Sequence, residues 1–90
     1  MQTIFEPKAA RHFASLLRQE SRDMRGRTAT MRTALSELRS TWKDAKYDAF
    51  CKLFEDTTVD LTRFTAHVDE YAQYLSRKAD IIDRYLRHRY

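Results

Sequence analysis

Hydrophobic side chains in the second half of the chain recur every seven residues, in two rows that lie three residues apart. The first row consists of Tyr47, Phe54, Leu61, Val68, Leu75 and Ile82. The second row consists of Phe50, Thr57, Phe64, Tyr71, Lys78 and Tyr85. A repeat sustained for this long is typical of a helix in coiled-coil-like packing. The pattern predicts a helix over about residues 45–87 whose packing face is formed by these two rows.

The first half of the chain carries a weaker version of the same repeat. Its two rows are Ala10, Leu17, Met24, Met31 and Leu38, and Ala14, Ser21, Thr28, Leu35 and Trp42. Pro7 suits the first turn of a helix, because the N–H groups there have no intrahelical partner. Gly26 costs about 1 kcal/mol relative to alanine and marks the point where the helix would bend or fray. One helix is predicted over about residues 7–40.

Residues 41–44 separate the two repeats and predict a turn. Either Thr41 or Asp44 could cap the second helix by accepting hydrogen bonds from its free N–H groups. A short loop between two long helices makes an antiparallel hairpin. One glycine and one proline in 90 residues are too few for a strand-rich fold. The sequence therefore predicts a single all-α domain over residues 1–90.

The apolar or small face of the second helix is wider than one partner helix can cover. A third row, next to the first, consists of Cys51, Thr58, Thr65, Ala72 and Ala79, and beyond the other edge lie Leu53, Tyr74 and Ile81. We expect two hairpins to dimerise through this face into a four-helix bundle, as a homodimer or with a like hairpin. The alternative is that the hairpin's own long side chains cover the face.

Charged residues form two stripes with the same seven-residue spacing. The basic stripe is Arg11, Arg18, Arg25, Arg32 and Arg39, and the acidic stripe is Asp48, Glu55, Asp69 and Asp83. In a hairpin that turns near Trp42, residue numbers that sum to about 86 lie opposite each other. This rule places Arg32 near Glu55 and Arg18 near Asp69, so that the stripes pair and set the register.

The net charge of +4 keeps a second interpretation open, that of a basic helical protein that binds nucleic acid through its arginines. Arg22 and Arg27 have no obvious acidic partner and support this alternative. A membrane-surface helix is a weaker interpretation, because the apolar face follows a coiled-coil period. No run of apolar residues is long enough to span a membrane, and the amino terminus has no Sec-type signal peptide.

The chain contains no pattern of residues that indicates catalysis. His12, His67 and His88 are isolated, no metal-binding spacing occurs, and no glycine-rich phosphate loop is present. Cys51 lies in the row of small residues, where it is expected to pack rather than to react. The sequence predicts a protein that is not an enzyme and binds neither metal nor cofactor.

Trp42 and Asp44 at the turn resemble the W-x-G motif of the WXG family, the early-secreted-antigen-like hairpin proteins of type VII secretion, with W-x-D in its place. The positions of Ala45, Tyr47, Phe50 and Phe54 after the motif are similar to the family's second helix. The resemblance implies a cytoplasmic protein that can be exported without a Sec signal peptide. It also implies a dimer that serves as substrate, chaperone or adaptor of a secretion system, with a secretion ATPase or a larger effector as partner.

Two further expectations concern single regions of the hairpin. Trp42 is expected to pack at the turn, against a partner's helix or against the second helix near Tyr47 and Phe50. At the other end, residues 1–5 give little cover to the apolar end of the second helix. This end is expected to dock a partner where the family carries its export motif, a motif that the sequence does not match. The residues concerned are Ile81, Ile82, Tyr85 and Leu86.

Overall fold

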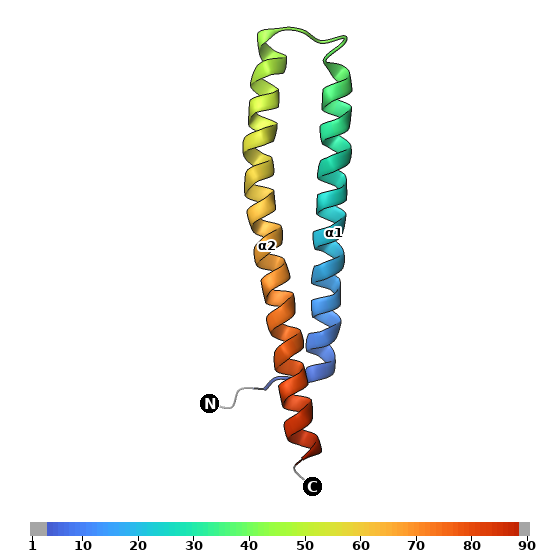
Figure 1. Ribbon diagram of the computed structural model, residues 1–90, viewed down its shortest axis with the longest axis vertical. Coiled ribbons are helices and arrows are strands. Elements are labelled where there is room, and N and C mark those ends of the chain that lie inside the picture. Colours follow the sequence, from blue (N-terminus) through green and yellow to red (C-terminus); the bar gives the residue numbers. More distant parts are fainter. Residues whose placement is uncertain (1–3, 89–90) are drawn as a thin grey trace.

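The computed structural model describes residues 4–88, which form two long antiparallel helices joined by a short turn (Figure 1). Helix α1 spans Pro7–Leu38 and helix α2 spans Ala45–Arg87. The predicted all-α hairpin and both helices are confirmed, although α1 ends two residues earlier than expected because residues 39–41 form a turn. Helix α1 continues without a break through Gly26.

Helix α1 begins at a well-formed cap. The carboxylate of Glu6 accepts hydrogen bonds from the N–H groups of Lys8 at 3.2 Å and Ala9 at 3.0 Å, and Pro7 occupies the first helical position. These bonds satisfy N–H groups that have no partner within the helix. The predicted role of Pro7 as the start of the helix is confirmed.

Asp44 caps α2. Its backbone is extended, with φ of −140° and ψ of 178°, and its Oδ1 accepts a hydrogen bond from the Tyr47 N–H at 3.0 Å. Thr41, the other candidate cap, instead donates its hydroxyl to the carbonyl oxygen of Leu38 at 3.2 Å. The start of α2 is therefore fixed by the side chain of the W-x-D sequence.

The contact between the helices uses two of the three rows of α2. Thr65, Ala72 and Ala79 of the small row are buried against α1, as is Tyr47, and the rest of the row that begins at Tyr47 is half-buried. Small side chains in the row of Thr65 let the two helices approach closely. The row of Phe50, which was also predicted for the packing or dimer face, is exposed in the hairpin at Phe50, Phe64 and Tyr71. The row of Phe50 therefore lies outside the contact.

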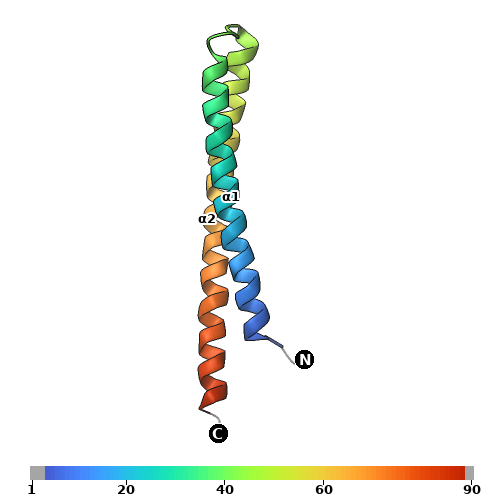
Figure 2. The ribbon, with the colours of Figure 1, turned by 90° about the vertical axis from the view of Figure 1, so that its right-hand side faces the viewer.

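The molecule is a thin rod with dimensions of 70 × 24 × 14 Å (Figure 2). Helix α2 has 43 residues and α1 has 32, so the carboxy-terminal end of α2 extends past the start of α1 (Figures 1 and 2). Within residues 4–88, no helix combines the length and the apolar character needed to cross a membrane.

Candidate functional site

The turn end of the rod is held by contacts between Trp42, Tyr47 and Arg39. The Trp42 and Tyr47 rings meet edge to face, with centroids 5.3 Å apart, and Arg39 lies 5.7 Å above the Tyr47 ring. Tyr47 is 2% exposed and donates its hydroxyl to the Leu35 carbonyl at 2.6 Å. Burial raises the pKa of the Tyr47 phenol. Trp42 thus packs on the second helix at Tyr47, as expected, while Phe50 remains exposed.

The carboxylate of Asp44 is stabilised in its charged form at this turn. The hydrogen bond from the Tyr47 N–H lowers the pKa of Asp44 most, and the Trp42 side chain lowers it further. The start of α2 also carries the positive end of the helix dipole, which favours an anion. The turn motif therefore has a structural role, the capping of α2.

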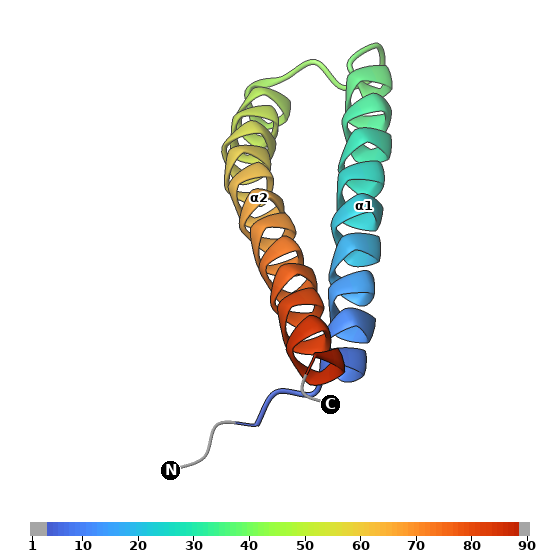
Figure 3. The same ribbon diagram turned by 60° about the horizontal axis from the view of Figure 1, so that its bottom comes forward.

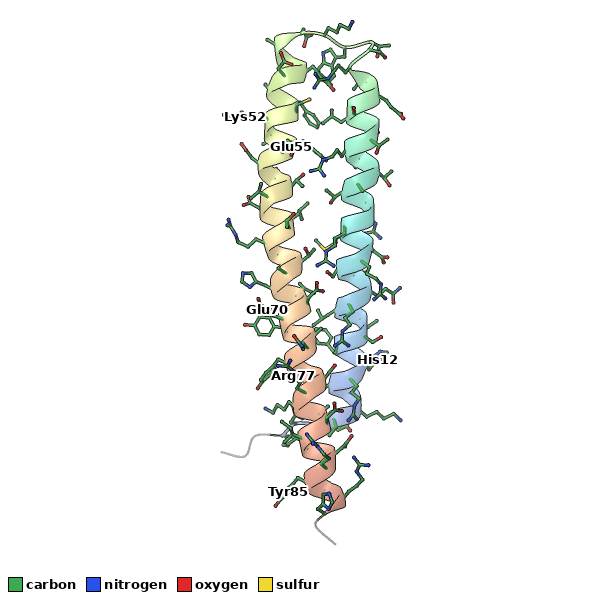
Figure 4. All side chains as sticks on the ribbon, viewed as in Figure 1. His12, Lys52, Glu55, Glu70, Arg77 and Tyr85 are labelled. Atoms are coloured by element: carbon green, nitrogen blue, oxygen red, sulfur yellow. The ribbon has the colours of Figure 1, made fainter. Side chains whose placement is uncertain are left out.

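One side of the hairpin carries the ion pairs between the two stripes. Arg11 bonds to Asp80 at 2.9 Å and to Asp83 at 2.5 Å, and Arg25 bonds to Asp69. The predicted pair of Arg32 with Glu55 is present at 3.4 Å, and Figure 4 labels Glu55 on this side. Pairs as exposed as these contribute about 0–1 kcal/mol each and mainly set the register.

The expected pair of Arg18 with Asp69 is wrong. Arg18 donates to Ser76 at 3.2 Å, because Asp69 is bound by Arg25, which lowers the pKa of that carboxyl group. Helical side chains lean toward their own amino terminus. In an antiparallel pair, a side chain of α1 leans toward the open end of the hairpin and a side chain of α2 leans toward the turn. Two side chains therefore meet when their Cα atoms are offset along the rod. The residues that pair have numbers summing to more than 86 toward the open end of the hairpin.

On the opposite side of the hairpin, several large apolar side chains are exposed. Glu55, Asp69 and Asp83 each follow a residue of the row of Tyr47 by one position, which is about 100° around the helix. The residues of the row of Phe50 follow it by three positions, which is about 300°. The two sets therefore flank the contact with α1 on opposite sides. We name the outer apolar face by its exposed residues Phe50, Leu53, Phe64, Tyr71 and Tyr74. Tyr71 is 66% exposed.

Helix α1 adds apolar side chains to the same side of the hairpin. Phe13 and Leu16 are exposed there, and Met31 and Leu38 are exposed nearer the turn. Phe13 and Leu16 are not among the surface residues predicted from the sequence. The signal was present, because Phe13 follows Ala10 by three positions, as Phe50 follows Tyr47.

The residues expected to form one packing or dimer face lie on two different sides of α2 in the hairpin. The row of Tyr47, Phe54, Leu61, Val68 and Leu75 turns toward α1, and Phe50, Phe64 and Tyr71 turn away from the contact. Lys52 and Glu70, which lie on neither row, also point away from α1 (Figure 4). The expected docking residues at the end of α2 are exposed at Ile81, Tyr85 and Leu86 and half-buried at Ile82.

The whole chain exposes far more surface than a compact protein of its size. Its accessible surface is 7578 Å², whereas a compact monomer of this mass exposes about 5,500 Å². The excess of about 2,000 Å² reflects the rod shape, in which each helix has only one neighbour. A hairpin of this shape therefore has excess accessible surface that a partner could bury.

Within residues 4–88, no three His, Cys, Asp or Glu side chains lie close enough to hold a metal ion. A groove of about 200 Å³ lies between the helices on the ion-paired side, lined by Arg25, Arg32, Thr28 and Leu61 among others. No protein-family model matches this chain, and no curated protein or solved structure matches it either.

Proposed function

We propose that this chain is a helical-hairpin protein without enzymatic activity that acts by dimerising through its outer apolar face. The observation that carries this proposal is the row of exposed large side chains along α2, from Phe50 to Tyr74. Large apolar side chains exposed in number along one face mark interaction surfaces in soluble proteins. The occupant is a second hairpin, which completes a four-helix bundle.

The exposed area supports a partner as long as the hairpin itself. Stable and obligate interfaces bury roughly 2,000–5,000 Å² in total, and two hairpins that each lost the excess surface would bury about 4,000 Å². A short peptide would cover only a part of a face that runs for about 36 Å along α2 from Phe50 to Tyr74. A second copy has the required length and the same seven-residue period.

The biological role that we propose is the one implied by the resemblance to the WXG family. In this role the dimer is a substrate, chaperone or adaptor of a type VII-like secretion system or a related multi-protein system. Support comes from Trp42 and Asp44, which lie at the turn between the two helices and fix the start of α2.

The alternative function, nucleic-acid binding, has weaker support. Arg11, Arg25 and Arg32 of the basic stripe are bound to carboxylates, so their charges are largely offset. Arg22 and Arg27 line a shallow depression beside Gly26, and within residues 4–88 neither has an acidic partner at ion-pair distance. Arg22 and Arg27 by themselves make a small electrostatic footprint for a phosphate backbone.

The test of the dimer is sedimentation equilibrium on the full chain at tens of micromolar. We expect a particle of twice the chain mass of 10.8 kDa. The double variant Phe64→Ser, Tyr71→Ser should sediment as a monomer, because it removes two large side chains from the outer apolar face. The control is Val59→Ser, an exposed apolar residue outside both rows, which should remain dimeric.

A monomeric wild type at these concentrations would contradict the proposal, and so would a double variant that dimerises as well as the control. The nucleic-acid alternative is tested with a DNA duplex in the same buffers. Binding that weakens steeply with salt and is lost in Arg22→Glu, Arg27→Glu would favour that alternative, since such binding is driven by counterion release.

A further inference from the structure

The end of the rod opposite the turn leaves part of the hairpin's own core row uncovered. Leu86 belongs to the same seven-residue row as Ala72 and Ala79, which are fully buried, yet it is 42% exposed. The reason is that α1 begins only at Pro7 and does not reach the last two turns of α2 (Figures 1 and 2). We name this region the basic tip, defined by Ile81, Ile82, Arg84, Tyr85, Leu86 and Arg87.

Other apolar side chains gather at the same end. Tyr85 is 67% exposed, and Figure 4 shows it on the part of α2 beyond α1. The amino-terminal segment passes beside the end of α2 (Figure 3), where Lys78 Nζ lies 4.7 Å from the centre of the Phe5 ring. Ile4, next to Phe5, is 88% exposed. The end of the rod therefore carries exposed aliphatic and aromatic groups from two segments.

The charges around these groups are mainly positive. Asp80 and Asp83, the carboxylates on this part of α2, both bind Arg11. Among the residues that the structure describes, no carboxylate lies at ion-pair distance from Arg77, Arg84 or Arg87. The tip thus combines exposed apolar side chains with unpaired cations.

We propose that the basic tip binds an anionic phospholipid surface. Helices with apolar side chains on one face and arginines on the other bind at the bilayer interface, and each cation near an anionic leaflet adds to the attraction. The tip is a single projecting helix end that offers few side chains, whereas an ordinary protein interface buries about 800 Å² on each partner. A bilayer interface accepts such a small convex end, so a lipid surface fits it better than a protein groove does.

The proposal is tested by vesicle flotation of the full chain. One set of vesicles contains phosphatidylcholine alone, and the other contains phosphatidylcholine with phosphatidylglycerol at a ratio of about 7 to 3. We expect the chain to float with the anionic vesicles at low salt and to remain unbound with the neutral ones. Equal binding to both vesicles, or no binding to anionic vesicles at about 1 mM lipid, would overturn the proposal.

A matched pair of charge reversals separates the tip from the overall charge of the chain. Arg84→Glu, Arg87→Glu changes the tip, and Lys52→Glu, Arg63→Glu makes the same change of net charge elsewhere on α2. The tip variant should bind anionic vesicles at least about tenfold more weakly, and the control should stay within about twofold of the wild type. Similar losses in both variants would overturn the assignment to the tip.

A third variant, Tyr85→Ser, Leu86→Ser, keeps the charge and removes apolar groups. Its vesicle binding should also fall, because insertion of these side chains supplies part of the affinity. Circular dichroism on all three variants reports whether the hairpin is folded. Sedimentation reports the dimer separately, so a failure of the dimer and a failure of the tip give different results. Unchanged vesicle binding by a folded Tyr85→Ser, Leu86→Ser variant would contradict the proposal.

Discussion

Asp44 sets the geometry of the turn with a single side chain. Its extended backbone and its hydrogen bond to the Tyr47 N–H place it as the cap of α2. No residue in the described range 4–88 has a positive φ, so the turn needs no glycine. The conformation that Asp44 adopts is therefore open to any residue.

The charge of Asp44 should make a pH-dependent contribution to stability. The pKa of Asp44 is lowered in the folded state, so its contribution is present above the unfolded pKa near 3.8 and is lost as pH falls through the folded pKa. Asn keeps the cap without the charge. We expect Asp44→Asn to melt below the wild type at pH 7, and the difference to shrink below pH 4. A difference in melting temperature that stays constant from pH 7 to pH 3 would contradict this role.

At the scale of the elements, the caps and the period of the helices were predictable from the sequence. Which of the two rows beside the row of Tyr47 packs against α1 was not. Both the row of Phe50 and the row of Cys51 flank the row of Tyr47, and hydrophobicity alone favours the larger side chains. The structure buries Thr65, Ala72 and Ala79 instead, because close approach of two helices depends on small volume. The outer apolar face is therefore visible only once the hairpin is built.

Substitution of Gly26 tests how much the helix propensity of α1 contributes to the stability of the hairpin. It is exposed within an unbroken helix, and an added Cβ would meet no atom within 4 Å. Gly26→Ala should therefore stabilise the hairpin by about 1 kcal/mol, or roughly 4–8 °C in melting temperature. The converse control is Ala29→Gly, which is also exposed on α1 and should destabilise by a similar amount. A melting temperature that falls in Gly26→Ala would indicate that a partner packs on this position in solution.

At the scale of the whole molecule, the two stripes and the unequal helix lengths determine which surfaces remain open. The pairing of the stripes was predictable from spacing, and the pair of Arg32 with Glu55 confirms it near the turn. Farther along, the partners are displaced by one heptad, so that Asp69 binds Arg25 and Arg18 binds Ser76. The rule failed there because the stripe position opposite Arg25 is Thr62, which has no carboxylate, and Arg25 takes the next acidic residue instead.

The final prediction concerns the boundary between the folded rod and its tip. The sequence analysis placed the docking segment at Ile81, Ile82, Tyr85 and Leu86, but Asp80 and Asp83 both bind Arg11 and belong to the rod. Deletion of residues 84–90 removes the projecting turns and leaves these ion pairs. We therefore expect the truncated chain to keep its helicity and to melt within about 5 °C of the wild type.

The same truncated chain should still dimerise in sedimentation experiments, because the outer apolar face from Phe50 to Tyr74 is intact. It should lose the vesicle binding that we assign to the basic tip. A second truncation that also removes residues 80–83 serves as the comparison, and it should melt lower because Arg11 then loses both carboxylates. Unfolding of the shorter deletion would show that the last turns of α2 belong to the core of the dimer, because the hairpin alone gives Leu86 no cover.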